Sequence, residues 1–330
     1  MKLFKRFQNY PRPIKVSAFI TIILRLLSEC GQSTPPLRVA LLEWPPYELA
    51  FWAEHNGWLD KEKVQLLEYK TPAEVTRSFA SGAVDIIAVT TDFALALAAQ
   101  HPETRIVIVI DASNGGDVVL SRQALDPAQS LKGKTIAVEA GPLGNYMLAR
   151  FLERFSLMPS DITIEYVDIP QQVDYWMNTD VDLLITYEPN KTRLLNEGAQ
   201  VIFSSKDIPN EIVDVFLVRE SLIKNRKSDL MHFTHAWFKA VDDLLSNKPE
   251  LFSFIGERES IPADDIRAIF TEIYMPDVKA NQALLSGQIS EFIQGLKLNE
   301  QVMRDSNMLP SKVSINKDKI VSSLLVDGMN

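Results

Sequence analysis

Acidic and aromatic residues stand in the segments that follow the short apolar runs of this 330-residue chain. The first segment reads Glu43-Trp44-Pro45-Pro46-Tyr47, and comparable segments fall at 90–92, 111–117, 139–145 and 187–189. They contain carboxylates and aromatic rings but neither lysine nor arginine. A carboxylate accepts hydrogen bonds from N–H groups and an aromatic face attracts cations, whereas a simple anion would require cationic side chains. The residues therefore predict non-covalent binding of a cationic, zwitterionic or nitrogen-heterocyclic molecule.

Ligand contacts are predicted for a defined set of residues in these segments. The set is Glu43, Trp44, Tyr47, Thr91, Asp92, Asn114, Asp117, Glu139, Gly144, Asn145 and Glu188. Several of them have a structural alternative. Trp44 could pack on a sheet edge and Tyr47 against its own helix, while Thr91 and Asp92 suit the first turn of a helix. Glu188 could be a solvated loop acid.

The segment 141–145 also has two interpretations. It holds two glycines and a proline and precedes a predicted helix. The free N–H groups at the start of that helix could bind an anion, or the segment could form an ordinary strand-to-helix turn.

Apolar runs and helix signals alternate along the chain. Strands are predicted over 37–43, 63–69, 84–90, 104–110, 133–140, 161–169, 181–189, 199–205 and 211–220. Helices are predicted between them, and the one over 71–81 begins with Thr71, Pro72 and Glu74, a capping-box pattern. This alternation indicates an α/β fold with parallel sheets and helices on both faces. Ligands of such sheets collect beyond the carboxyl ends of the strands, where the predicted contacts fall.

After residue 220 the pattern is almost wholly helical. Apolar side chains recur at three- and four-residue steps at Leu230, Phe233, Trp237, Ala240, Val241 and Leu244. Such a stripe is typical of a helix with one buried face. We expect these helices to pack back on the first α/β unit.

A polar break interrupts the apolar stretch "VIVIDASNGGDVVLSR" at 107–122. Its second half, 116–122, is matched by 213–219, and the two suggest crossovers between two α/β lobes. Glycines at such a crossover would allow a hinge motion, in which Asp117 could bind the ligand or pin the hinge. The alternative is a bulge or tight turn within a single sheet.

Several stretches together carry a family resemblance. They include "VALLEWPPYELAFWAEHNGWL", "DASNGGDVVLSR", "LKGKTIAVEAGPLGNYMLARFLERFSL", "VDLLITYEPNKTRLLNEGAQVIFSS" and "EIVDVFLVRE". These resemble the NitT/TauT solute-binding proteins of ABC importers for nitrate, taurine, other sulfonates and thiamine precursors. The resemblance implies a two-lobed type II periplasmic-binding fold with the ligand cleft between the lobes. It also implies that 37–120 and 218–330 form lobe one, that 121–217 form lobe two, and that ligand contacts lie in the loops chosen above.

The first 30 residues read as an export signal. Basic residues precede the apolar run Val16–Leu27, which is too short to span a bilayer. A buried first helix is the alternative. The run ends at Leu27-Ser28-Glu29-Cys30, which resembles a bacterial lipoprotein cleavage box and makes Cys30 a candidate for lipidation. Residues 31–36 would then form a tether, and the protein would be periplasmic or otherwise extracytoplasmic.

Other classes of function find little support in the sequence. The net charge is −9, and the basic residues at the N-terminus leave the remainder still more acidic, which argues against nucleic-acid binding. No P-loop, G-x-G-x-x-G or G-x-S-x-G motif indicates a cofactor or an enzyme. His232 and His235 lack an obvious third metal ligand. The expected protein is a monomer without cofactor that delivers a small molecule to an ABC permease. A sensing subunit for a membrane signalling protein and a biosynthetic enzyme on the same fold are the alternatives.

Overall fold

A computed structural model describes residues 34–124, 131–286, 290–310 and 315–329. The chain divides into two compact units, 1–35 and 36–330, and the fold described below is that of the second. The predicted export signal and the lipidation candidate Cys30 lie outside the described residues. Among the residues that the structure does describe, no helix has the length and apolar character needed to cross a membrane.

The first of two sheets has six strands in the order β11-β4-β10-β3-β1-β2. Their bounds are β1 (Leu37–Leu41), β2 (Val64–Glu68), β3 (Ile86–Thr90), β4 (Thr104–Ser113), β10 (Val213–Arg219) and β11 (Ile273–Tyr274). Strands β1, β2 and β3 pair in parallel, as the sequence predicts. Strand β10 is antiparallel to both of its neighbours, β3 and β4. The chain therefore inserts a late strand into the middle of the sheet.

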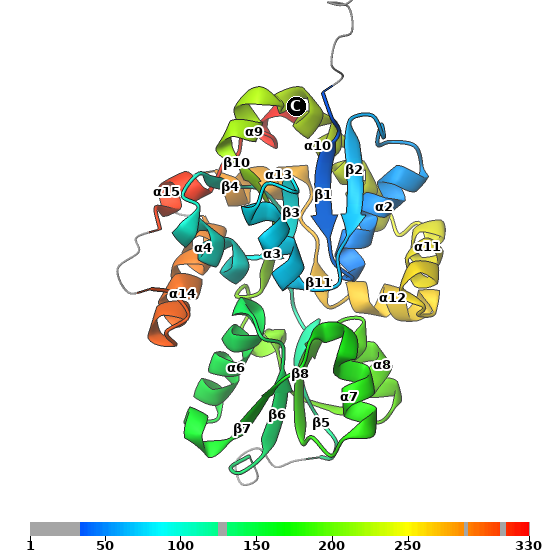
Figure 1. Cartoon of the computed structure of the whole chain (residues 1–330). Coiled ribbons are helices and arrows are strands. Elements are labelled where there is room, and N and C mark those ends of the chain that lie inside the picture. Colours follow the sequence, from blue (N-terminus) through cyan, green and yellow to red (C-terminus); the bar gives the residue numbers. More distant parts are fainter. Residues whose placement is uncertain (1–33, 125–130, 287–289, 311–314, 330) are drawn as a thin grey trace, which may run out of the picture. The chain divides into compact units, whose positions relative to one another are not determined.

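Helices cover both faces of this sheet. In Figure 1, α3 (Pro72–Ala80) and α4 (Thr91–Gln100) lie in front of it, while α10 (Lys227–Leu245) and α13 (Val278–Leu285) lie behind. The predicted capping box at the start of α3 is present, with the Thr71 hydroxyl accepting from the Glu74 amide at 3.3 Å and the Glu74 carboxylate accepting from the Thr71 amide at 3.1 Å. The predicted apolar stripe of α10 is buried, and Phe216 of β10 packs edge-on against Phe233 and Trp237.

The other helices that belong with the first sheet are η1 (Pro45–Tyr47), α2 (Glu48–His55), α9 (Glu220–Asn225), α11 (Pro249–Glu259), α12 (Ala263–Phe270), α14 (Glu291–Asp305), α15 (Lys317–Ile320) and η5 (Asp327–Met329). Helices α13 and α15 contact β4, and α10 contacts α2. The C-terminal helices thus pack back on the first sheet, as predicted.

The second sheet has five strands in the order β7-β6-β8-β5-β9. Their bounds are β5 (Asp117–Ser121), β6 (Thr135–Val138), β7 (Thr163–Tyr166), β8 (Leu183–Tyr187) and β9 (Gln200–Ser204). Its helices are α6 (Pro142–Arg154), η2 (Pro159–Asp161), η3 (Ile169–Gln171), α7 (Gln172–Asn178), α8 (Asn190–Asn196) and η4 (Ser205–Asp207). Strands β6, β7 and β8 run parallel, whereas β5 is antiparallel to β8 and β9.

The chain changes sheets at 114–116 and at 205–212. The stretches predicted to be crossovers, 116–122 and 213–219, instead hold strands β5 and β10, each of which lies in a single sheet. The chain thus leaves the first sheet after Ser113 and returns to it at Val213. Because β4 and β5 belong to different sheets, a bulge within one sheet does not explain the polar break.

The two glycines of the first connection serve close packing as well as backbone geometry. Gly115 has a φ of 127°, which L side chains rarely adopt. A Cβ atom on Gly116 would lie 2.8 Å from the Trp44 ring. The second connection touches the first, because the Ser205 hydroxyl accepts from the Gly115 amide at 2.6 Å and lies 2.9 Å from the Ser113 hydroxyl. The two glycines therefore allow close packing at this connection in addition to the rotational freedom predicted from the sequence.

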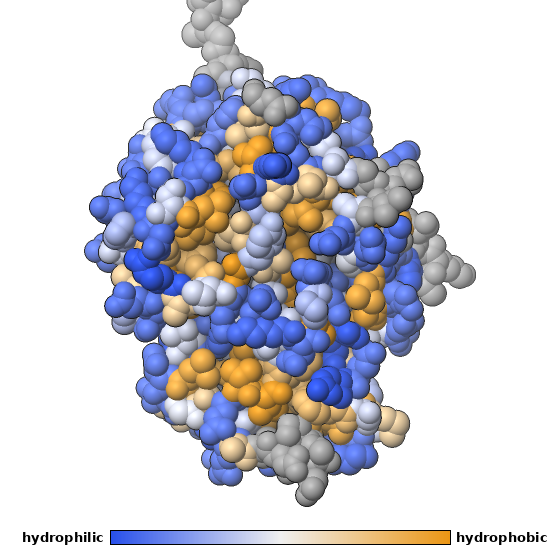
Figure 2. Space-filling model, turned by 180° about the vertical axis from the view of Figure 1, so that it is seen from behind, coloured by the Kyte–Doolittle hydropathy of each residue, from blue (hydrophilic) through white to orange (hydrophobic). Residues whose placement is uncertain are grey.

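The face of the described unit that Figure 2 shows is mostly hydrophilic. Figure 2 shows apolar side chains in separate patches over both halves of the face turned to the viewer, with hydrophilic residues between them. Large apolar side chains that are exposed include Met158, Tyr166, Met177, Leu245 and Tyr274. Isolated exposed apolar residues are normal on soluble domains and identify no site by themselves.

Candidate functional site

A small cavity lies where the two sheets meet. Its volume is about 40 Å³, which is room for only a few water molecules. The first sheet and its loops contribute Trp44, Tyr47, Asp111 and Asp214 among others, and the second contributes Asp117, Leu143 and Tyr187. The cavity is therefore built by parts of the chain far apart in sequence.

Three aspartates form the acidic side of this cavity. Asp111 lies on β4 and Asp214 on β10, where the two residues are direct cross-strand partners, and Asp117 opens β5. Their exposed fractions are 1%, 5% and 3%. The indole Nε1 of Trp44 donates to Asp111 Oδ2 at 3.1 Å, while Asp214 Oδ1 is buried without a hydrogen-bond partner in the described structure. Burying three carboxylates together is unfavourable unless hydrogen-bond donors or positive charges compensate them.

Burial raises the pKa of each of these aspartates. The pKa of Asp117 rises to about 7 because burial disfavours its charged form, and the charge of Asp92 acts in the same direction. Burial and the neighbouring acids also raise the pKa of Asp111 and Asp214. A hydrogen bond with Tyr47 opposes the rise at Asp214. Without a cation, this group of side chains therefore retains protons near neutral pH.

Aromatic rings form the remaining walls. Trp44 meets Tyr187 edge-to-face, with ring centroids 5.9 Å apart and an interplanar angle of 87°. Tyr47 and Phe93 are buried and also line the cavity. Aromatic faces next to carboxylates can hold a flat nitrogen heterocycle or an organic cation.

The structure brings together part of the predicted set. Glu43, Trp44, Tyr47 and Asp117 line the cavity, while the other predicted contacts do not. Asn114 is exposed, and its backbone amide donates to the Glu272 carbonyl at 2.8 Å.

Helix packing places further predicted residues elsewhere. The Thr91 hydroxyl donates to Asn299 Oδ1 of α14 at 2.8 Å. Gly144 lets α6 approach β6, because a Cβ there would lie 2.3 Å from the Glu139 carbonyl oxygen. Asn145 is half-buried one residue further along α6. Gly144 is therefore required for the packing of α6 on β6.

Three of the predicted acids are buried outside the lining. Burial raises the pKa of Asp92 to about 6 and that of Glu139 to about 8. Glu188 is 1% exposed and is not a solvated loop acid, because it pairs with Lys191 at 3.2 Å and accepts from the Thr192 amide at 2.9 Å. These acids add negative charge around the cavity without lining it.

Eleven lining residues were not in the predicted set, and the acidic and aromatic ones among them are Phe93, Asp111, Tyr187 and Asp214. Asp111 and Tyr187 lie in segments that the sequence singles out. Asp214 lies at the start of a strand, a position that the rule about carboxyl ends does not select. Because β10 runs antiparallel to β3, the beginning of β10 reaches the edge where β3 ends. A lone acid at the start of an otherwise apolar run was the available signal.

Metal ligation receives no geometric support in the described part of the chain, where no three His, Cys, Asp or Glu side chains are grouped to hold an ion. His232 Nε2 accepts a hydrogen bond from the Asp60 amide at 2.9 Å, which gives that histidine a structural contact.

The chain is similar in sequence to a known protein family and to one curated protein. Residues 46–250 match the family model described as NMT1/THI5 like. The chain belongs to the NMT1/THI5-like family. An ABC transporter periplasmic binding protein of Brachyspira hyodysenteriae is 23% identical over 117 residues, which cover 36% of this chain and 34% of that protein. The chain thus aligns with about a third of that relative's length.

Solved structures share the fold of this NMT1/THI5-like chain. The alkanesulfonate-binding protein SsuA from Xanthomonas axonopodis pv. citri, bound to MOPS, has a TM-score of 0.71 at 15% identity and covers 88% of this chain and 99% of its own. The periplasmic aliphatic sulphonate binding protein SsuA from Escherichia coli has a TM-score of 0.70 at 15% identity, with coverages of 87% and 92%. These similarities confirm the predicted two-lobed α/β periplasmic-binding fold.

Proposed function

We propose that this protein captures a small cationic, zwitterionic or nitrogen-heterocyclic solute outside the cytoplasm and delivers it to an ABC importer. The observation that carries the proposal is the buried cavity with Asp111, Asp117 and Asp214 on its wall and no lysine, arginine or histidine among its described lining residues. Desolvated carboxylates are stabilised by a ligand that brings N–H donors or positive charge. The relative from Brachyspira, an ABC transporter periplasmic binding protein, supports the transport role.

The ligand class differs from that of the structural neighbours. Both SsuA proteins are named for binding sulfonates. A sulfonate group carries negative charge and only accepts hydrogen bonds, so it offers no donor to the oxygens of these buried carboxyl groups. The aromatic residues Trp44, Tyr47 and Tyr187 would instead stack on a heterocycle or surround a cation. A pyrimidine of the thiamine-precursor type has this chemistry.

Capture would involve movement of two lobes, one around each sheet. A 40 Å³ cavity is too small for a metabolite, so the lobes must separate or the side chains must move when a solute enters. Ion pairs join the two parts in the structure described here. Arg193 of α8 contacts Glu43 at 2.9 Å and donates to the Glu259 carbonyl at 2.8 Å, and Lys191 pairs with Glu272 near the first connection. A ligand that contacts both lobes would shift the population towards this closed arrangement.

We expect Arg193→Ala to weaken ligand binding by about threefold to tenfold, mainly through faster dissociation. The substitution removes one ion pair and one hydrogen bond that join the lobes, and Arg193 is partly exposed, which limits their strength. The measurement is the dissociation rate by stopped-flow fluorescence. Arg154→Ala, an exposed arginine over the Phe155 ring within lobe two, is the matched control. Equal rates for the wild type and Arg193→Ala would contradict the role of Arg193 in closure.

A thermal-shift screen tests the proposed function itself. The purified protein is heated with amines, aminopyrimidines, taurine and nitrate, because a ligand that binds only the folded state raises the unfolding midpoint. We expect an amine or an aminopyrimidine to stabilise the protein, by about 2.7 kcal/mol when its concentration is a hundredfold above the dissociation constant. Stabilisation by nitrate alone would refute the ligand class, whereas taurine carries an ammonium group and falls within it as a zwitterion.

A further inference from the structure

Two of the cavity aspartates lie directly opposite each other on neighbouring strands. Asp111 and Asp214 are register partners on adjacent antiparallel strands, so their side chains emerge on the same face of the sheet. The Cβ atoms of such partners are typically about 4.5–5.5 Å apart. Both side chains are more than nine-tenths buried, and both line the cavity. The two carboxyl groups therefore share one desolvated space.

The hydrogen-bond donors around Asp111 and Asp214 leave one carboxyl oxygen of the pair without a partner among the described residues. Trp44 Nε1 donates to one oxygen of Asp111, and Tyr47 lies within hydrogen-bond reach of Asp214. Asp214 Oδ1 has no partner among the described residues. A side-chain hydrogen bond with Asp214 is among the influences on the pKa of Asp111 and acts against the rise caused by burial. A hydrogen bond between two carboxyl groups requires a proton on one of them.

The ionisable groups around Asp111 and Asp214 also disfavour ionisation of both carboxyl groups. On the side of the first sheet, the facing titratable groups are Glu43, Tyr47 and Asp92. On the side of the second sheet they are Asp117, Glu139, Tyr187, Glu188 and Lys191. The one cation among these groups, Lys191, already pairs with Glu188 and Glu272. Two ionised carboxylates would thus face each other without compensation, which burial strongly disfavours.

We propose that the Asp111–Asp214 pair holds one shared proton in the ligand-free protein, and that a ligand cation with at least two N–H donors replaces this proton. One donor satisfies the oxygen that gives up the proton, and another reaches Asp214 Oδ1. The proton leaves to the solvent as the cation enters, so the charge of the pair and its bound cation is conserved. This inference rests on the proposed function and narrows its ligand class to cations with at least two N–H donors, such as primary ammonium, amidinium, guanidinium and protonated amino-heterocyclic groups. A quaternary ammonium ion, which lacks N–H donors, is excluded.

A first experiment tests the shared proton without any ligand. An aspartate that keeps its proton only in the folded state makes stability fall as pH rises from about 5 to about 8, because the unfolded side chain ionises near pH 3.9. In Asp214→Asn the side-chain amide can donate an N–H to Asp111 and takes the place of the shared proton. We therefore expect the unfolding constant of the wild type to rise about tenfold more per pH unit than that of the variant.

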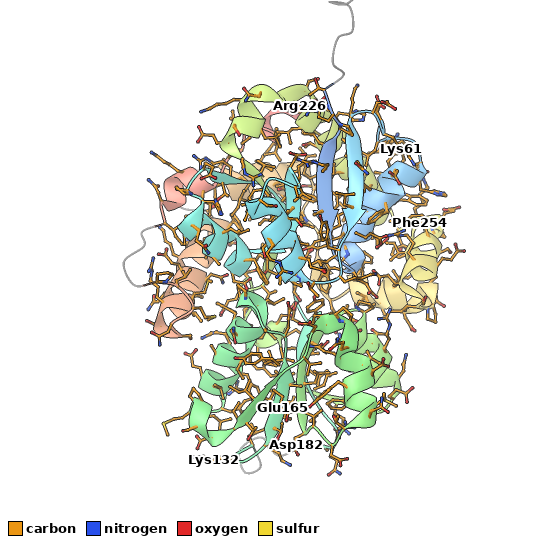
Figure 3. The ribbon with its side chains drawn as sticks, in the orientation of Figure 1. Lys61, Lys132, Glu165, Asp182, Arg226 and Phe254 are labelled. Atoms are coloured by element: carbon orange, nitrogen blue, oxygen red, sulfur yellow. The ribbon has the colours of Figure 1, made fainter. Side chains whose placement is uncertain are left out.

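The control for this experiment is Asp182→Asn. Asp182 lies at the far end of the lower sheet in Figure 3 and accepts from Lys134 Nζ at 2.6 Å. Hydrogen bonds from Lys134 and the Thr135 amide hold the pKa of Asp182 low against the effect of burial, so its substitution should not remove the fall in stability between pH 5 and 8. Parallel pH profiles for the wild type and Asp214→Asn would overturn the shared proton.

A second experiment tests the exchange and the ligand class. Calorimetric titrations with methylguanidinium and tetramethylammonium are run at pH 7 in two buffers that differ in ionisation enthalpy. We expect methylguanidinium to bind the wild type with release of about one proton, to bind Asp214→Asn without release, and to bind more tightly than tetramethylammonium. Equal affinities, absence of proton release or absence of methylguanidinium binding would overturn the exchange. Capture of nitrate alone in the thermal-shift screen would overturn the proposed function while leaving the first experiment to decide the shared proton.

Discussion

Trp44→Ala is expected to weaken ligand binding at least tenfold while leaving the protein folded. Trp44 is 5% exposed, forms one wall of the cavity and meets Tyr187 edge-to-face. Its loss removes an aromatic face worth about 1–2 kcal/mol towards a ring or cation, together with the hydrogen bond to Asp111. Isothermal titration with the ligand found by thermal shift measures the change, and circular dichroism checks the fold.

Two further variants separate the contributions of this residue. Trp44→Phe keeps an aromatic face but loses the N–H donor to Asp111, so its affinity should fall between the wild type and Trp44→Ala. Trp58→Ala is the matched control, because Trp58 lies under Lys239 at 4.1 Å and does not line the cavity. An unchanged dissociation constant for Trp44→Ala would remove Trp44 from the site.

Gly144→Ala is expected to lower the free energy of unfolding by about 3 kcal/mol, the upper end of ordinary overpacking. The new Cβ would lie 2.3 Å from the Glu139 carbonyl oxygen and 2.8 Å from Val138 Cγ2. The first contact is with backbone, which cannot move aside as the end of a side chain does. Helix α6 must then shift away from β6. Urea denaturation followed by circular dichroism measures the loss.

The neighbouring residue provides the control for Gly144. Asn145 is half-buried on the same helix, and Asn145→Ala should change stability by less than about 1 kcal/mol. If Gly144→Ala proved as stable as Asn145→Ala, the close approach of α6 and β6 would not constrain this position. Retained stability with lost ligand binding would instead favour the sequence-based prediction that Gly144 contacts the ligand.

Much of the fold follows from local sequence signals. The run 84–90 contains strand β3 because Ile86–Val89 is apolar, and α3 begins at Pro72 because Thr71 and Glu74 cap it. The apolar stripe from Leu230 to Leu244 marks the buried face of α10. These features depend on residues near one another in the chain, which is why the sequence alone predicts them.

The site is only partly predictable for a related reason. Trp44 and Asp117 were predicted because they follow a strand or a polar break, and both line the cavity. Asp214 was missed because its position depends on the direction of β10 within the sheet. Glu188 was predicted as a ligand contact, but the side chain turns to Lys191 one helical turn away. Such placements are set by pairing between distant segments, which periodicity does not reveal.

The central position of β10 also has a consequence for how the protein folds. Strands β3 and β4 are formed from the first 113 residues, yet the strand that joins them ends only at Arg219. Until that residue is available, the two edges remain open and the loop between them must close at an entropic cost. An N-terminal fragment that stops before Val213 therefore lacks the middle of its own sheet. The first lobe is completed only after the whole of the second has been synthesised.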